Sequence, residues 1–278
     1  MAGQPAHPQV IVTADVAMPA AYVTRAPGNR LRRLASGLNP RGPTVRAPCV
    51  AFSISHPTAG TILVDTGMHP DVSTSLREDF GLPMSVMFRS LRPRGNFDEQ
   101  LRSLGIESET IERVVMTHLH VDHTSGMRLL PRARFTCSAE ELKAARSRTA
   151  IADGYVSKHL PPDSRFDAID FEQDARAHGP FPRAIDLLGD GSVMLLSTPG
   201  HTAGHMSVLV RLETGPQVLL VGDAAYTLQN IAEGTLPMLT NDDEASRRSL
   251  RQIKAFIEAE PQALIVPTHD PDAWKQLA

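Results

Sequence analysis

The sequence of 278 residues is poor in cysteine, tyrosine and tryptophan, with 2, 3 and 1 residues of each type. Two cysteines, Cys49 and Cys137, are too few for a disulfide framework, and we expect both to be small buried residues on strands. No apolar run approaches the ~20 residues that a membrane-spanning helix needs. The N-terminus lacks the positive start and apolar stretch of a secretory signal. These absences favour a soluble, cytoplasmic protein.

An excess of charge of one sign is also lacking. The 28 Lys and Arg residues stand against 31 Asp and Glu residues, which gives a net charge of −3. This balance argues against nucleic acid or a membrane surface as the main partner and leaves a small-molecule substrate. The length suits one large domain. We predict a single domain over residues 1–278, with the polar, proline-rich segment 149–191 as an insertion or cap.

Short runs rich in apolar and β-branched residues predict strands along the whole chain. They lie at residues 9–13, 21–24, 49–55, 61–65, 113–117, 134–137, 192–197, 206–212, 217–221 and 263–268. Capping signals predict three helices between them, which begin near Asn96, Ser138 and Asn241. Many strands with few helices and no regular alternation indicate a mixed α/β sandwich.

The stretch 80–88 is apolar and contains Gly and Pro, so we interpret it as a flexible loop. Its Met84, Met87 and Phe88 could line a pocket for an acyl tail, because methionine adapts to varied shapes. Core packing or a dimer contact is an equally good interpretation of these residues. A homodimer is therefore left open.

The hexapeptide 118–123 holds three histidines and an aspartate, namely His118, His120, Asp122 and His123. It follows a predicted strand, and alternation places His118 and His120 on one side. A turn into a short helix would let Asp122 and His123 reach an adjacent point. Three imidazoles and a carboxylate are costly to bury unless something binds them, and they are ligands that zinc, iron and manganese accept. The alternative is a polar surface turn with scattered histidines.

Three more potential ligands stand where predicted strands end. His201 follows the strand at 192–197, Asp223 follows the strand at 217–221, and His269 follows the strand at 263–268. Strand ends are where a rigid sheet presents functional groups. Taken singly, Asp223 could be a turn residue and each histidine a hydrogen-bonded core residue. Together with the hexapeptide they predict a metal site.

This ordered set resembles the five-motif signature of the metallo-β-lactamase superfamily, and Asp65 in Leu-Val-Asp-Thr-Gly extends the resemblance. The resemblance implies an αββα sandwich of the α/β (α+β) class with a two-metal site along one edge of the sheets. It assigns the first metal to His118, His120 and His201, the second to Asp122, His123 and His269, and the bridging position to Asp223. Asp65 is expected to bond to the ligand loops, and His205 to make a structural hydrogen bond.

Residues 222–227 read Gly-Asp-Ala-Ala-Tyr-Thr, which is similar to a stretch of the lactonase branch that opens N-acyl-homoserine lactones. The resemblance implies that Tyr226 binds the carbonyl oxygen as charge develops on it, although Tyr226 could instead pack over the sheet. Two ions ~3.5–4 Å apart generate a bridging hydroxide that attacks the ester carbonyl. Asp122, a metal ligand, would then pass a proton to the leaving alkoxide.

The sequence therefore predicts a dinuclear metal-dependent hydrolase that opens a small lactone, a quorum-quenching activity if the lactone is an N-acyl-homoserine lactone. We expect two divalent ions per chain, with zinc as the first choice and iron, manganese or cobalt as alternatives. A thioester, β-lactam or organophosphate hydrolase on the same site is the rival interpretation. A non-catalytic metal-binding protein is a further alternative, against which the complete ligand set argues.

Overall fold

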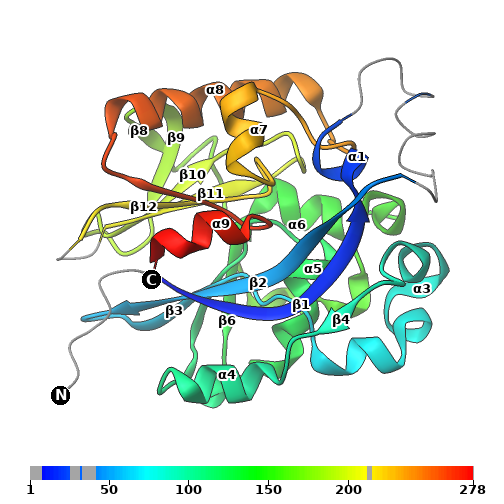
Figure 1. Cartoon of the computed structure of the whole chain (residues 1–278). Helices are drawn as coiled ribbons and strands as arrows, with labels where there is room; N and C mark the ends of the chain where they lie inside the picture. The colour runs from blue at the N-terminus through cyan, green and yellow to red at the C-terminus, as the bar shows by residue number, and fades with distance from the viewer. Residues whose placement is uncertain (1–7, 26–31, 33–41, 212–214, 278) are drawn as a thin grey trace.

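The computed structural model describes residues 8–25, 32, 42–211 and 215–277. These residues form two β-sheets that pack face to face, with helices on both outer faces (Figure 1). The first sheet has seven strands in the order β4-β1-β2-β3-β5-β6-β7, and the second has six in the order β13-β12-β11-β10-β9-β8. The predicted αββα sandwich is confirmed.

The first sheet combines an antiparallel half with a parallel half. Its strands are β1 (Gln9–Pro19), β2 (Thr44–His56), β3 (Gly60–Val64), β4 (Arg92–Pro93), β5 (Arg113–Val115), β6 (Arg134–Ser138) and β7 (Phe166–Ile169). The pairs β3·β5, β5·β6 and β6·β7 are parallel, so the carboxyl ends of these strands meet at one edge of the sheet.

The second sheet is antiparallel except at β13. Its strands are β8 (Arg176–His178), β9 (Phe181–Asp186), β10 (Val193–Ser197), β11 (Met206–Val210), β12 (Val218–Gly222) and β13 (Leu264–Pro267). β12 and β13 are parallel, so both end at the same edge. Segment 149–191 supplies β7 to the first sheet and β8 and β9 to the second. The predicted strand 206–212 extends to Leu212, which lies outside the described residues.

Eight α-helical segments are described. They are α1 (Ala20–Val23), α3 (Leu76–Met87), α4 (Phe97–Ser103), α5 (Val121–Thr124), α6 (Ala139–Ala145), α7 (Leu228–Glu233), α8 (Asp243–Ala259) and α9 (Pro271–Trp274). Short 3₁₀ turns are η1 (Pro70–Thr74), η2 (Ser108–Thr110), η3 (Ser125–Leu129), η4 (Ala150–Asp153), η5 (Ser157–His159), η6 (Asp163–Arg165) and η7 (Lys275–Leu277). None of the described helices is long and apolar enough to cross a membrane.

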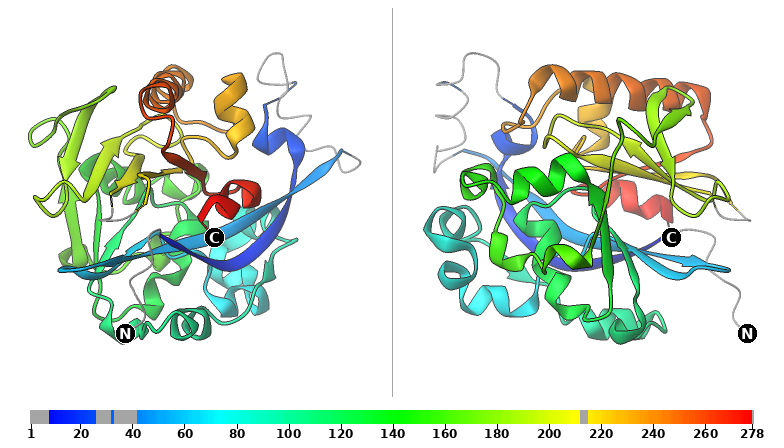
Figure 2. Two further views of the ribbon diagram at one scale, coloured as in Figure 1. Left: turned by 60° about the vertical axis from the view of Figure 1, so that its left-hand side comes forward. Right: turned by 180° about the vertical axis from the view of Figure 1, so that it is seen from behind.

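The three predicted helices are present. The side chains of Asn96 and Ser138 cap α4 and α6 as expected, and the third helix is capped by Asp242 rather than by Asn241. α8 lies over the outer face of the second sheet, as the views from two further directions show (Figure 2). Its buried Leu250, Ile253 and Phe256 pack there, and each such side chain contributes about 1.5–3 kcal/mol.

Two predictions from the sequence were wrong. Residues 21–24, predicted as a strand, belong largely to α1, because a short apolar run has no periodicity that separates helix from strand. The stretch 80–88, predicted as a loop, lies mostly in α3. Gly81 adopts a positive φ of 74° that kinks this helix, so the glycine marks a bend inside a helix rather than a loop.

The core between the sheets is apolar. β2, β3 and β5 contribute buried residues such as Ile54 and Ile62, which face buried valines and leucines of β10, β11 and β12. Cys49 on β2 and Cys137 on β6 are buried, as predicted. This core fixes the two sheets relative to each other. It thereby fixes the distance between the loops that leave their shared edge.

Candidate metal centre

The loop after β5 carries the histidine-rich hexapeptide. The strand ends at Val115, and the segment that follows carries His118 and His120 before α5 begins. The rings of these two histidines lie 4.6 Å apart between centroids. α5 begins directly after His120 and carries Asp122 and His123. The local geometry predicted from the alternation is therefore present.

The other three candidate ligands come from the second sheet. His201 lies beyond β10, Asp223 follows the last residue of β12, and His269 lies two residues beyond the end of β13. All three are at most 7 % exposed. The structure brings them to the same edge as the hexapeptide, because the core holds the two sheets together there.

Asp223 lies at the centre of this cluster. Its Oδ2 is 3.4 Å from His201 Nε2 and 3.3 Å from His269 Nε2, and its Oδ1 is 3.6 Å from His123 Nε2. The second carboxylate of the cluster belongs to Asp122, and its Oδ2 is 3.8 Å from both His123 Nε2 and His269 Nε2. Donor atoms bound about 2.0–2.2 Å from one tetrahedral ion lie roughly 3.3–3.6 Å apart, so these spacings suit shared ions.

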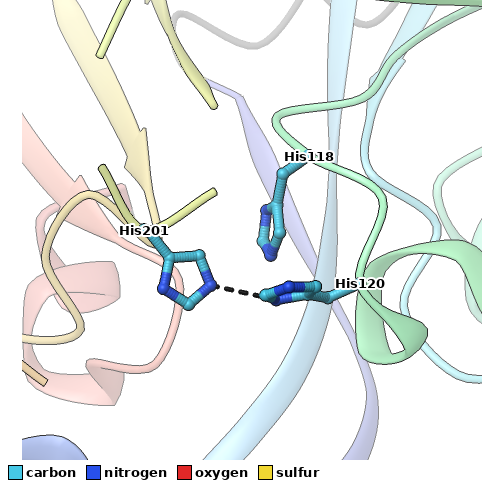
Figure 3. Close-up of side chains that lie close together, drawn as sticks. All are labelled: His118, His120 and His201. Atoms are coloured by element: carbon cyan, nitrogen blue, oxygen red, sulfur yellow. Dashed lines mark hydrogen bonds between the residues drawn. The ribbon is translucent and has the colours of Figure 1, made fainter. Parts of the chain in front are cut away.

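Three histidines form one compact group (Figure 3). The imidazoles of His118, His120 and His201 point toward one another from two different loops, and His201 Nε2 is 3.0 Å from His120 Nδ1. The ring centroids of His118 and His201 are 4.8 Å apart. Burial lowers the pKa of each of these three imidazoles, so they are neutral donors.

The remaining groups have their charge set by one another. Burial acts to lower the pKa of His123, but the carboxylates of Asp65, Asp122 and Asp223 raise it above its ordinary value. Burial likewise opposes ionisation of Asp223, yet His269 and His123 hold the pKa of that carboxyl well below its usual range. Asp223 is thus ionised, whereas the raised pKa values of His123 and His269 favour protonated rings, and a metal ion bound there would displace those protons.

Several buried polar atoms in this cluster have no hydrogen-bond partner. They are His118 Nε2, His123 Nε2, His201 Nδ1 and Asp223 Oδ1. Buried polar atoms are rarely left unpaired, because each one costs about 1–3 kcal/mol. Three overlapping groups each have their ligand atoms within 4.8 Å of one another, namely His118, His120 and His201; His118, His123 and Asp223; and Asp122, His123 and His269. The residues present fit divalent metal ions.

A surrounding shell of hydrogen bonds orients the candidate ligands. Asp65, held at a φ of 59°, accepts hydrogen bonds from Thr117 N and Thr117 Oγ1 and contacts His123 Nδ1, each at 2.8 Å. His269 Nδ1 lies 2.7 Å from the Pro48 carbonyl oxygen, which turns Nε2 toward the centre. The predicted contacts of Asp65 with the ligand loops are confirmed.

A cavity of about 340 Å³ opens over the cluster. Tyr226 lies in its floor with its ring 4.9 Å from that of His269 and 5.7 Å from that of His201. Burial, followed by the nearby Asp223 and Asp122, raises the pKa of Tyr226 above its ordinary value, so the phenol keeps its proton. A buried hydroxyl in this position can donate a hydrogen bond to a bound molecule.

Apolar and aromatic side chains also line the cavity, and the sequence analysis foresaw only part of them. Met84 and Phe88 line it, as predicted, whereas the side chain of Met87 lies outside the described residues. Tyr22 and Tyr155 line the cavity too, and the sequence analysis did not single them out. The rarity of tyrosine is the one sequence feature that could have drawn attention to them. The chain has only three tyrosines, and all three line this cavity.

Comparison with known proteins agrees with this geometry. The model of the Metallo-beta-lactamase superfamily matches residues 46–269. The N-acyl homoserine lactonase AttM of Agrobacterium fabrum is 32% identical over 235 residues, which cover 84% of this chain and 86% of that protein. An N-acyl homoserine lactonase of Bacillus thuringiensis is 26% identical over 215 residues, which cover 76% and 77%.

Solved structures show the same fold. A mutant of AiiA from B. thuringiensis, with N-decanoyl-L-homoserine bound at its active site, matches with a TM-score of 0.75 at 21% identity. The match covers 99% of this chain and 97% of that chain. The chain therefore belongs to the metallo-beta-lactamase superfamily. Within that superfamily it is an enzyme, a metal-dependent hydrolase.

Proposed function

We propose that this hydrolase binds two divalent ions and opens the ring of N-acyl-homoserine lactones. The observation that carries the proposal is the position of Asp223 between two donor sets at the floor of the cavity. His118, His120 and His201 would hold one ion, and Asp122, His123 and His269 the other, with Asp223 between them. The names of the AttM relatives, at 32% identity, support the substrate class.

Zinc is the proposed metal, because imidazole and carboxylate are donors that it accepts in tetrahedral sites. Two bound ions would supply an activated water at neutral pH and a Lewis acid for the carbonyl oxygen. The chain itself supplies buried side chains in fixed orientations for that chemistry. The imidazoles of His118, His120 and His201 stay neutral. Asp65 and the Pro48 carbonyl fix the ring orientations of His123 and His269.

Tyr226 is the proposed donor to the substrate carbonyl oxygen. Its hydroxyl keeps its proton, and its ring lies between His201 and His269 at the cavity floor. Such a donor, placed in a buried site before the reaction, stabilises the negative charge that develops on this oxygen in the transition state.

Asp122 is the proposed carrier of the proton for the leaving group. Opening a lactone breaks the bond between the carbonyl carbon and the ring oxygen, and that oxygen must gain a proton to leave as an alcohol. Asp122 lines the cavity and extends from α5 toward His269 and His123. A carboxylate in this position can take a proton from the attacking water and deliver it to the ring oxygen.

The wall of the cavity suits a substrate with a polar head and an apolar tail. Met18, Met84, Phe88 and Leu239 provide apolar surface above the polar floor. A small number of fixed polar groups within a mostly apolar cavity is typical of sites for small molecules. The lactone head would lie over the ligand cluster, and the acyl chain would run along this wall.

Metal content and lactone hydrolysis, measured together, test the proposal. Purified protein is assayed by pH-stat on lactones with short and long acyl chains, before and after chelation, beside a thioester, a β-lactam and a phosphotriester. We expect two ions per chain and ring opening that is lost on chelation and restored by zinc. Two bound ions with turnover of the thioester, the β-lactam or the phosphotriester, and none of the lactones, would overturn the lactonase proposal. A protein that takes up no ion would overturn the dinuclear site.

A homodimer and a cytoplasmic location stay predictions.

A further inference from the structure

One buried carboxylate outside the ligand set connects the two loops that carry the three-histidine group. Glu141, in the first turn of α6, has no exposed surface. Its Oε1 accepts a hydrogen bond of 2.9 Å from Leu119 N, and its Oε2 accepts one of 3.1 Å from Gly204 N. A buried carboxylate costs several kcal/mol of solvation, so each of its oxygens needs a donor such as these.

The position of the two amides gives this contact its significance. Leu119 lies between His118 and His120, and Gly204 lies three residues after His201. The first loop follows β5 of the first sheet, and the second loop follows β10 of the second sheet. Glu141 belongs to neither loop, yet it binds both. Its carboxylate therefore links the backbones of two loops whose histidines converge from separate sheets.

The first turn of α6 holds the second loop by a further contact. Ser138 Oγ donates a hydrogen bond of 2.8 Å to the Gly204 carbonyl oxygen and accepts one of 3.1 Å from Glu141 N. A Cβ at Gly204 would lie 2.1 Å from Ser138 Oγ and 2.3 Å from Glu141 N. Only glycine permits this approach, so the helix and the loop are in direct backbone contact.

Glu141 also reaches the wall of the cavity. The buried phenol of Tyr155 has its pKa raised by burial and by the adjacent Glu141 carboxylate. The Tyr155 ring in turn lies 5.0 Å from the His120 ring, centroid to centroid, and lines the cavity. A single carboxylate thus contacts both ligand loops and the tyrosine that packs on His120.

We propose that Glu141 is a positioning residue that holds the three-histidine group, and that it governs metal affinity at this group and not at the second donor set. The inference rests on the proposed function, because it requires metal binding. Glutamine at this position would keep one acceptor and turn an NH₂ group toward a backbone N–H. Loss of partners that orient metal ligands lowers metal affinity by about 10–100-fold.

A titration of the metal-free protein tests this inference without an activity assay. Glu141→Gln is compared with Asp65→Asn, which alters a contact of His123 in the second donor set, and with Asp79→Asn, a buried carboxylate that pairs with Arg128. Zn²⁺ affinity is measured by competition with a chromophoric chelator. Cadmium NMR then identifies which of the two bound ions is affected, because the two sites differ in their number of nitrogen donors.

We expect Glu141→Gln to weaken the ion at the three-histidine group at least tenfold and to leave the other ion within about twofold. Asp65→Asn should weaken both ions, because Asp65 contacts His123 and also bonds Thr117, whose hydroxyl lies 3.1 Å from His118 Nδ1. Asp79→Asn should change neither affinity. Equal affinity of Glu141→Gln and wild type for both ions would overturn the inference. An equal loss at both sites that follows a lower melting temperature of the metal-free protein would also overturn it, since that is the mark of a general structural role.

Two further results keep this inference separate from the proposed function. If the wild-type protein takes up no ion, the proposed dinuclear site fails and this inference with it. If wild type takes up two ions and the variant binds them as well, this inference alone fails. Should Glu141→Gln not fold, Ser138→Ala removes two hydrogen bonds from the same contact, one to the Gly204 carbonyl oxygen and one from Glu141 N. It is expected to weaken the same ion several-fold, and an unchanged affinity would overturn the inference.

Discussion

The ring Nε2 of His205 accepts a hydrogen bond of 2.9 Å from the backbone N–H of Asp223. His205 Nδ1 therefore carries the proton and donates to the Thr198 carbonyl oxygen at 3.1 Å. Burial lowers the pKa of His205 to about 4, so the ring is a neutral acceptor under the central carboxylate. The structural role predicted for His205 is confirmed, and it fixes the backbone at the residue that lies between the two donor sets.

His205→Ala should therefore weaken metal binding as well as stability. The variant leaves the buried Asp223 amide without a partner, which costs about 1–3 kcal/mol, and lets the carboxylate move. We expect the free energy of unfolding of the metal-free protein to fall by that amount and metal affinity to fall about 10–100-fold. Urea denaturation and chelator competition measure the two effects. His178→Ala, on the edge strand β8, is the matched control. Unchanged metal affinity in His205→Ala would contradict this prediction.

Tyr226→Phe should lower turnover without loss of metal. The substitution removes one hydroxyl that faces the proposed position of the carbonyl oxygen, and none of the proposed ligands. We expect kcat to fall by up to about 10²-fold while the metal content stays at the wild-type value. Steady-state kinetics and metal analysis of the same preparation check both points. Tyr22→Phe, which changes another tyrosine that lines the same cavity, should keep kcat near wild type. Loss of metal from Tyr226→Phe would remove the reason for the assignment.

Met84→Ala should change the preference for acyl-chain length. Met84 is buried in the cavity wall on α3, whereas Leu82 on the same helix is 59% exposed. Loss of the thioether surface is expected to raise KM for long-chain lactones about tenfold, or about 1.4 kcal/mol, and to leave short-chain lactones unaffected. Leu82→Ala serves as the control and should change neither. An equal effect of Met84→Ala on short and long chains would place the acyl chain elsewhere.

Because of His159, the free energy of unfolding should decrease as the pH is lowered from 6.5 toward 4. Burial, with Arg128 and Lys158 opposed by Asp79, lowers the pKa of His159 to about 4 from its ordinary 6.5. The native imidazole stays neutral while the unfolded chain takes up a proton below pH 6.5, so the free energy of unfolding decreases as the pH falls from 6.5 toward 4. Between pH 6.5 and 5 this amounts to about 2 kcal/mol.

Urea denaturation of wild type and His159→Gln at pH 7.5 and pH 5 checks the pH prediction. The histidines of the candidate metal centre are common to both proteins, so their contribution cancels in the difference. The variant should lose about 2 kcal/mol less than wild type over this interval. Parallel losses in the two proteins would show that His159 is not the group responsible.

Much of the candidate site was predictable, because its residues carry local signals. Four ligand-type residues lie within one hexapeptide, and His201, Asp223 and His269 each follow a buried apolar strand. Strand periodicity and ligand chemistry are properties of neighbouring residues, so one sequence is enough to detect them. The same local information failed for residues 21–24 and 80–88, where short apolar runs fit more than one conformation.

The sequence by itself determined the donor types, their order and their places at strand ends. Only the tertiary structure decided which other residues meet them. Glu141 binds Leu119, 22 positions away, and Gly204, 63 positions away, and these contacts exist only because two sheets pack on one core. Tyr22, Tyr155 and Tyr226 line one cavity for the same reason. Contacts between distant segments depend on how whole sheets pack, and no local pattern in the chain encodes that packing.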